Sequence, residues 1–251
     1  MSPDEPVKRV LLVIADIGGY TRFMTSNKMS LLHSQIVISE LTQAILDAAC
    51  APLAVSKLEG DAVFMYAVID EGWDVQRETV RRSLLGFFEA FTQRAVELKD
   101  SNLCRDDCKG CSEVDRLRLK IVVHSGEALF HRIGRFDELS GPDVIVIHRL
   151  LKNSVAVSEY VLFTESAARD LDLNAEVETI LGAERYDELG EIGTRVWYAL
   201  EGDRRNAEAR SVRDYSSLGF KIKNEWGKAV KLLKFKLRPG LLPKFGNLPI
   251  E

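Results

Sequence analysis

The sequence has no long apolar run, no large excess of one charge and few histidines or cysteines. Its 34 basic and 38 acidic residues give a net charge of −4, which argues against a general nucleic-acid-binding role. The apolar run Val10–Ala15 is too short to span a bilayer, and residues 1–8 carry no signal-peptide pattern. The four histidines are scattered, and we expect His124 to be a satisfied near-core residue. We therefore expect a cytoplasmic protein without a histidine-centred catalytic cluster.

The sequence has four cysteines. A reducing compartment argues against a disulfide framework for them. Three of them lie in one polar segment with the spacing C-x₃-C-x₂-C: Cys104, Cys108 and Cys111. Such thiolates can bind a structural Zn²⁺ if a fourth ligand comes from elsewhere. A redox switch and ordinary loop cysteines are the alternatives. We expect Cys50, which ends a predicted helix, to be a small buried apolar residue.

Hydrophobic residues make up 46% of the 251 residues, enough for a sizeable core. The patterning predicts strands at 9–15, 53–58, 62–68, 117–123, 157–164, 180–189 and 194–200, with 128–133 returning antiparallel to 117–123. It predicts helices at about 29–49, 70–98, 143–151 and 165–171. A hairpin within this mixed order favours an α+β fold with an antiparallel sheet over a doubly wound parallel sheet.

Two acidic residues occupy positions suited to metal binding. Asp16 ends the first buried strand and precedes a Gly-Gly turn, and Asp61 lies at the tip of the predicted hairpin. Two carboxylates at one sheet edge, completed by substrate phosphates, are a common Mg²⁺ site. The alternative is a helix cap and a turn acid. The metal hypothesis would fail if the two side chains lay on opposite faces, or if either were buried in a permanent salt bridge.

Four blocks, in order, resemble the catalytic domain of class III adenylate and guanylate cyclases. The family's opening FADIxGFT resembles IADIGGYTRFM at 14–24, and its KxxGD hairpin resembles KLEGD at 57–61. Its LrvGIHtGxv strand resembles LRLKIVVHSGEALF at 117–130, and its GdxVNxAxRL segment resembles GPDVIVIHRL at 141–150. The resemblance covers about residues 8–200 and is strongest to the cyclase-like DUF2652 group. It implies a ferredoxin-like cyclase fold with a mostly antiparallel sheet and helices on one face.

The resemblance also implies roles for individual residues. Asp16 and Asp61 match the pair that holds two Mg²⁺ or Mn²⁺ ions, which would activate the ribose 3′-hydroxyl and neutralise the phosphates. The phosphate-binding turn corresponds to the backbone of Ile17, Gly18, Gly19, Tyr20 and Thr21. Base recognition falls to Lys57 with Glu138, or with Asp137 if the register differs by one residue. Arg149 matches the arginine that steadies transition-state charge. The expected reaction converts ATP, or another nucleoside triphosphate, to a 3′,5′-cyclic nucleotide and pyrophosphate.

One position departs from the family pattern. The asparagine that orients the ribose is Ile145 in this chain, and its side chain cannot form a hydrogen bond. Losing one transition-state donor commonly lowers activity by on the order of a hundredfold. The rival hypothesis is therefore a catalytically silent module that binds nucleotide or a protein partner. For Arg149 the alternative role is a surface or interface salt bridge.

Class III sites lie between two subunits, with the metal acids on one chain and the arginine on the other. All matching residues occur on this chain, so we expect a head-to-tail homodimer with two equivalent sites. After the catalytic domain at 8–200 we expect a linker at 201–217. Residues 218–251 follow as a basic amphipathic extension, with eight basic residues and one acid between Phe220 and Lys244. That extension could contact an anionic membrane surface or pack on the domain.

Overall fold

The computed structural model describes residues 7–26, 31–100, 113–173, 177–205 and 207. A compact unit ends at Arg204. Its described strands are β1 (Val7–Gly18), β2 (Ala54–Glu59), β3 (Ala62–Val68), β4 (Arg118–Ile133), β5 (Phe136–Ser140), β6 (Tyr160–Thr164), β7 (Ile180–Tyr186) and β8 (Gly190–Tyr198). The described helices are α1 (Tyr20–Ser26), α2 (Leu31–Ala48), α3 (Trp73–Asp100), α5 (Pro142–Leu150) and α6 (Glu165–Asp170), with a 3₁₀ turn, η2, at Val114–Arg116.

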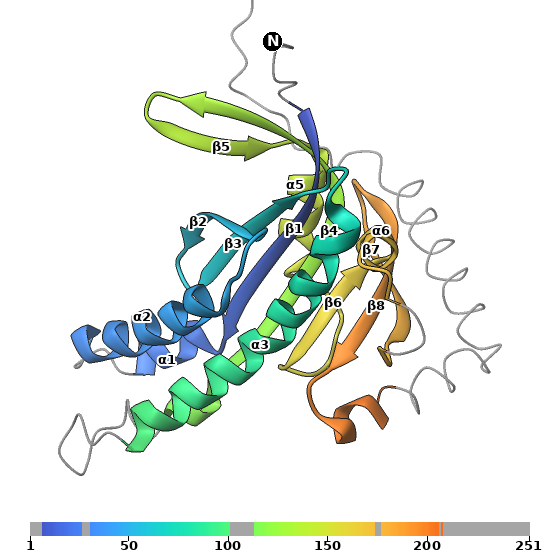
Figure 1. The fold of residues 1–251 in the computed structure, drawn as a ribbon. Helices are drawn as coiled ribbons and strands as arrows, with labels where there is room; N and C mark the ends of the chain where they lie inside the picture. The colour runs from blue at the N-terminus through green and yellow to red at the C-terminus, as the bar shows by residue number, and fades with distance from the viewer. Residues whose placement is uncertain (1–6, 27–30, 101–112, 174–176, 206, 208–251) are drawn as a thin grey trace, which may run out of the picture. The chain divides into compact units, whose positions relative to one another are not determined.

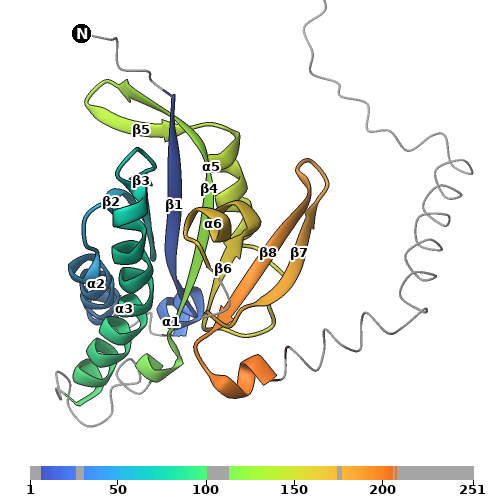
Figure 2. The same cartoon turned by 45° about the vertical axis from the view of Figure 1, so that its right-hand side comes forward.

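The described strands form one mixed sheet in the order β2-β3-β1-β4-β6-β8-β7, with β5 paired to β4 off this path. Pairing between neighbouring described strands is antiparallel except for the parallel pair β4–β6. Figure 2 shows β1 and β4 running side by side through the middle of the sheet. The central position of β1 explains its apolar run, because Val10–Ala15 is fully buried between two layers.

Helices cover both faces of the sheet. Alternate β1 residues, including Leu11 and Val13, pack with α2, α3 and α6, whereas Val10 and Leu12 pack with α5. In Figure 1, α3 crosses in front of the sheet and α5 lies behind it. The expected α+β architecture with a mostly antiparallel sheet is therefore confirmed. The prediction that the helices lie on one face of the sheet is wrong. Helix α5 packs its apolar residues Val144, Ile147 and Leu150 against the face opposite to α2, α3 and α6.

One predicted strand break is also wrong. Residues 118–133 form the single strand β4, whereas a return at 128–133 was expected. Gly126 does not make a turn; it sits in the extended strand, where an added Cβ would lie 2.1 Å from Cγ of Asp143. The reversal occurs instead at Gly134, whose φ of 61° suits a tight turn, and β5 returns along β4.

One further expectation is wrong. Cys50 is exposed rather than buried, because α2 ends at Ala48 and Cys50 lies in the connection that follows. Residues 201–205, which fall in the predicted linker, are helical, and the linker stays a prediction. The cysteines at 104, 108 and 111 and the basic segment 218–251 lie outside the described residues, so the zinc and membrane hypotheses remain predictions. No described helix is both long and apolar enough to cross a membrane.

Candidate functional site

The two predicted metal acids converge at one end of the sheet. Asp16 lies two residues before the end of β1 and faces Ala62 in the β1–β3 ladder. The backbone N–H of Ile17 donates to the carbonyl oxygen of Asp61 over 3.3 Å, which ties the β2–β3 turn to the end of β1. The two carboxyl groups are close enough that the negative charge of Asp16 raises the pKa of Asp61. The structure therefore brings together the pair that the sequence singles out.

The electrostatics of this pair favour a bound cation. Burial, followed by the negative charge of Asp16, raises the pKa of the Asp61 carboxyl from 3.8 to about 6. A backbone hydrogen bond and the charge of Lys120 oppose this shift. Two neighbouring carboxylates are hard oxygen ligands of the kind that Mg²⁺ and Mn²⁺ prefer, so the residues present fit such a cation.

Lys120 is a site residue that the sequence analysis missed. It faces Asp16 directly in the β1–β4 ladder, and its Nζ lies 2.8 Å from Oδ2 of Asp16. The side chains are only 23% and 16% exposed. Asp16 thus has the kind of ion-pair partner that would exclude a metal if the pair were permanent. The available signal was a lysine within the otherwise apolar stretch of β4, because cations rarely occur in buried strands without a partner.

A basic pocket adjoins the turn between β1 and α1. Gly19 has a φ of 89° there, a conformation that favours glycine. The pocket has a volume of about 310 Å³. It is lined by Gly18, Gly19, Arg116, Arg118, Lys120, Leu151, Asn153, Val155, Val157, Ser158 and Tyr160. Three cationic side chains beside a glycine turn form a surface suited to a polyanion such as a triphosphate. Because the Ile17 side chain is buried in the core, only its backbone can serve this site.

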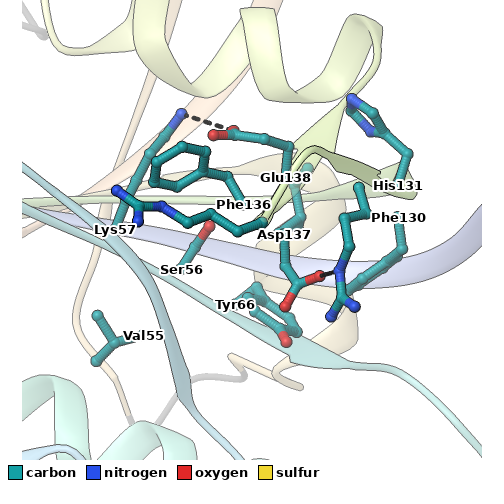
Figure 3. A pocket seen from close by; sticks show the side chains of 12 residues that line it. Val55, Ser56, Lys57, Tyr66, Phe130, His131, Phe136, Asp137 and Glu138 are labelled. Atoms are coloured by element: carbon teal, nitrogen blue, oxygen red, sulfur yellow. Dashed lines mark hydrogen bonds and ion pairs between the residues drawn. The ribbon is translucent and has the colours of Figure 1, made fainter.

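The predicted base-recognition pair is also assembled. Nζ of Lys57 on β2 lies 3.4 Å from Oε2 of Glu138 on β5. Figure 3 shows the two side chains pointing toward each other in a pocket of about 860 Å³. Asp137, the alternative partner, instead accepts a 2.7 Å hydrogen bond from exposed Arg132, and this contact lowers the pKa of Asp137. The geometry favours Glu138 over Asp137 as the partner of Lys57.

A second missed feature links Lys57 to α5. Oε1 of Glu59 lies 3.4 Å from Nζ of Lys57, and Oε2 of Glu59 lies 3.0 Å from Nε2 of His148. Nδ1 of His148 is 2.7 Å from the Val144 carbonyl oxygen. The His148 ring also packs edge-on against Phe64. Polar contacts thus run from Glu138 through Lys57 and Glu59 to His148. They connect the β2–β3 hairpin to α5, the helix that carries Arg149.

Arg149 and Ile145 occupy the outer face of α5. They are one helical turn apart, and the Ile145 residue and the Arg149 side chain are 55% and 54% exposed. Nη2 of Arg149 lies 3.2 Å from Oε2 of Glu188, which is also exposed; such surface pairs contribute little stability. Among the described residues, no hydrogen bond or ion pair joins Arg149 to Asp16 or Asp61. The described ion pair of Arg149 is therefore a surface contact with Glu188.

Two of the segments that resemble the cyclase pattern, residues 124–126 and 141–143, have a structural role. His124 is buried, and its Nε2 lies 2.9 Å from Oδ1 of Asp143, while its Nδ1 lies 3.0 Å from Oγ1 of Thr164. The backbone N–H of Glu127 donates to Oδ2 of Asp143 over 2.7 Å. The predicted satisfied near-core histidine is confirmed. Within the described part of the chain, no group of three or more His, Cys, Asp or Glu residues could hold a metal ion.

Comparison with solved structures places this fold among the class III nucleotide cyclase domains. The adenylyl cyclase CyaB from P. aeruginosa matches with a TM-score of 0.55 at 11% identity, covering 78% of this chain and 96% of that one. The guanylyl cyclase Cya2 matches with a TM-score of 0.58 at 10% identity, covering 76% and 92%. At these identities the likeness establishes the fold alone.

Sequence comparison identifies the particular family. Residues 38–160 match the family described as "Protein of unknown function (DUF2652)". The chain is also 33% identical over 202 residues to "Uncharacterized protein Rv2561/Rv2562" of Mycobacterium tuberculosis (strain ATCC 25618 / H37Rv), covering 79% of this chain and 90% of the relative. The chain belongs to the DUF2652 family and has a cyclase-like fold.

Proposed function

We propose that this protein is a nucleotidyl cyclase that converts ATP, or a related nucleoside triphosphate, to a 3′,5′-cyclic nucleotide and pyrophosphate. The observation that carries the proposal is the convergence of Asp16 and Asp61 at the end of β1, beside a basic pocket, with the Asp61 pKa raised to about 6. An acidic pair next to a polyanion-binding surface is the arrangement that cation-assisted phosphoryl chemistry requires.

In this reaction the ribose O3′ bonds to the α-phosphorus, the bond to the β-phosphate oxygen breaks, and the hydroxyl proton passes to solvent. Asp16 and Asp61 would hold the two Mg²⁺ or Mn²⁺ ions, which when bound supply charge neutralisation and activation of the hydroxyl. The backbone of residues 17–21 and the cations Lys120, Arg116 and Arg118 bind the phosphates. These residues position the triphosphate and balance its charge, the main requirements of phosphoryl transfer.

Lys57 and Glu138 supply complementary hydrogen-bonding groups for the base. An ammonium group donates only and a carboxylate accepts only, so the pair matches the adenine edge, where a ring nitrogen accepts and the amino group donates. Their separation of 3.4 Å and the pocket beside them support this role. We therefore place ATP first among the substrates.

The active enzyme is a head-to-tail homodimer in this proposal. Arg149 and Ile145 lie on the outer face of α5, and this exposure supports the proposal that Arg149 serves the site of the partner subunit. Because Ile145 cannot hydrogen-bond to the ribose, we expect turnover to be slower than in a cyclase with asparagine there, by on the order of a hundredfold.

The test is direct. Purified protein is incubated with each nucleoside triphosphate and Mn²⁺, and products are identified by mass spectrometry. We expect 3′,5′-cyclic AMP from wild type and none from Asp61→Asn, which preserves side-chain volume and removes the charge. An active Asp61→Asn preparation would point to a contaminating enzyme and contradict the assigned site.

A second candidate is a catalytically silent module that binds nucleotide, and the apolar Ile145 favours it. Calorimetric titration of ATP with Mn²⁺ separates the two functions. ATP binding that depends on Lys57 and Asp61, without any cyclic product, would support the silent module. Absence of both binding and product would contradict both candidates.

A further inference from the structure

Lys120 contacts both parts of the proposed site. Its Nζ is 2.8 Å from Oδ2 of Asp16 and 3.4 Å from the Leu151 carbonyl oxygen. Its side chain also lines the basic pocket beside Gly18 and Gly19. The ammonium group therefore lies between a carboxylate that would bind a cation and a surface that would bind phosphate.

The other two cations of the basic pocket are held differently. Nη1 of Arg116 contacts Oε1 of Glu113 at 3.2 Å, and Nη1 of Arg118 donates to the Leu117 carbonyl oxygen over 2.8 Å. Neither ion pair of these arginines involves Asp16 or Asp61. Lys120 is thus the pocket cation whose position directly affects the metal acids.

We propose that Lys120 pairs with Asp16 in the nucleotide-free protein and transfers to phosphate oxygens when a nucleotide binds, so that nucleotide and divalent cation bind cooperatively. This inference rests on the proposed function of the site. It assigns Lys120 as a positioning residue that keeps cation affinity low until a triphosphate is present.

The physical basis is competition for one carboxylate. An ammonium group 2.8 Å from Oδ2 of Asp16 forms an ion pair with it, and it neutralises one of the two charges that a divalent cation would need. Phosphate oxygens in the adjoining pocket offer the flexible lysine an alternative partner. Once Lys120 moves, Asp16 and Asp61 regain their full charge, and the cation gains two anionic ligands together with the phosphates.

The competing explanation is a permanent ion pair that only stabilises the β1–β4 ladder. In that case nucleotide would not release Asp16, and removing Lys120 would lower stability without any coupling between ligands. Reciprocity separates the two cases, because cooperative binding requires that each ligand raise the affinity of the other by the same factor.

The experiment measures Mn²⁺ binding to the full-length protein by electron paramagnetic resonance, without nucleotide and with a saturating non-hydrolysable ATP analogue. For wild type we expect the analogue to raise Mn²⁺ affinity well beyond the affinity of Mn²⁺ for the analogue alone. For Lys120→Met we expect nucleotide-free Mn²⁺ affinity about tenfold above wild type, and a coupling factor about tenfold smaller than in wild type. Lys120→Arg, which keeps the positive charge, should retain the coupling.

Two controls keep the outcomes distinct. Lys152→Met removes an exposed lysine near α5 and should change neither affinity nor coupling. Asp16→Asn should abolish specific Mn²⁺ binding. Unchanged nucleotide-free affinity in Lys120→Met, with binding still lost in Asp16→Asn, would overturn this inference and leave the proposed metal site intact.

A different pattern would count against the proposed function itself. Mn²⁺ binding that is the same in Asp16→Asn and wild type would exclude the acidic pair as the cation site, and the Lys120 inference would fail with it. Thermal unfolding of each variant checks that it folds. If Lys120→Met does not fold, Lys120→Gln replaces it, with the same expected gain in affinity.

Discussion

At the scale of single residues, Asp61 connects burial to a measurable pH dependence. Its carboxyl group has a pKa raised to about 6, chiefly by burial, and a cation binds the deprotonated form. We predict that Mn²⁺ affinity is nearly constant above pH 7 and falls about tenfold per pH unit below pH 6 as the proton competes. Spin-resonance titrations at pH 5, 6, 7 and 8 measure this. An affinity that stays constant across the range would contradict the role of Asp61.

The same shift predicts a change in stability. A folded-state pKa above the unfolded value of 3.8 means that the folded protein binds the proton more tightly. The resulting stabilisation is complete below pH 3.8 and is lost as pH rises through about 6. We therefore predict that Asp61→Asn raises the Tm relative to wild type more at pH 8 than at pH 5. Thermal unfolding in metal-free buffer tests this, and an equal Tm difference at both pH values would contradict it.

Gly126 illustrates a motif glycine whose function is packing. An added Cβ would lie 2.1 Å from Cγ of Asp143, the residue that also contacts His124. We predict that Gly126→Ala destabilises the protein by about 2 kcal/mol or more, as overpacking does. The control is Gly86→Ala within α3, where nothing lies within 4 Å of the added Cβ; it should be stabilising by about 0.5–1 kcal/mol. Denaturant unfolding of both variants measures the difference, and equal effects would contradict the packing role.

At the scale of elements, α5 carries the departure from the cyclase pattern. Ile145 is 55% exposed, so replacing it should change stability little. We predict that Ile145→Asn raises cyclase activity by on the order of tenfold or more, because it supplies the missing hydrogen-bonding group. Ile145→Leu is the matched control, without such a group, and should match wild type. Steady-state rates with ATP and Mn²⁺ decide the matter. Equal rates for the asparagine and leucine variants would show that Ile145 does not limit turnover.

Strands with a clear sequence pattern were predicted correctly, and the one with an ambiguous glycine was not. The apolar run ending at Asp16 predicted β1 because a central strand is buried on both faces. The Lys57–Asp61 hairpin was predicted from its turn residues. The break expected within β4 was wrong because a glycine can mark close packing as well as a turn. Gly126 leaves room for Asp143, which follows it by 17 positions and approaches only in the folded chain.

The parts of the site that sequence did not reveal depend on register and on contacts between distant segments. Lys120 and Asp16 are partners because β1 and β4 pair in one specific register, and a shift of one residue would place them on opposite faces. The contact between Glu59 and His148 joins residues 89 positions apart. Neither pair follows from local pattern. The Asp16–Asp61 and Lys57–Glu138 pairings were predicted through family resemblance, which carries such long-range information.

At the scale of the whole molecule, the proposed homodimer gives one chain two different half-sites. Asp16, Asp61 and the basic pocket lie at the end of β1, whereas Lys57, Glu138 and Arg149 belong to the β2–β5 side and the outer face of α5. Within the described chain Arg149 is paired only with Glu188. Complete sites would require a second copy, so the proposed homodimer should contain two sites, each with acids from one chain and Arg149 from the other.

This division predicts complementation between inactive variants. Asp16→Ala removes the acid half-site and Arg149→Ala the arginine half-site, so each homodimer alone should be inactive. After the two are mixed and their subunits exchanged, half of the dimers contain one of each chain and have one intact site of two. We predict recovery of about a quarter of wild-type activity. A mixture of Asp16→Ala with Asp61→Asn, which damages the same half-site twice, should recover nothing. No recovery in the first mixture despite proven exchange would contradict the shared site. Recovery in the second mixture would show instead that Asp16 and Asp61 belong to different half-sites.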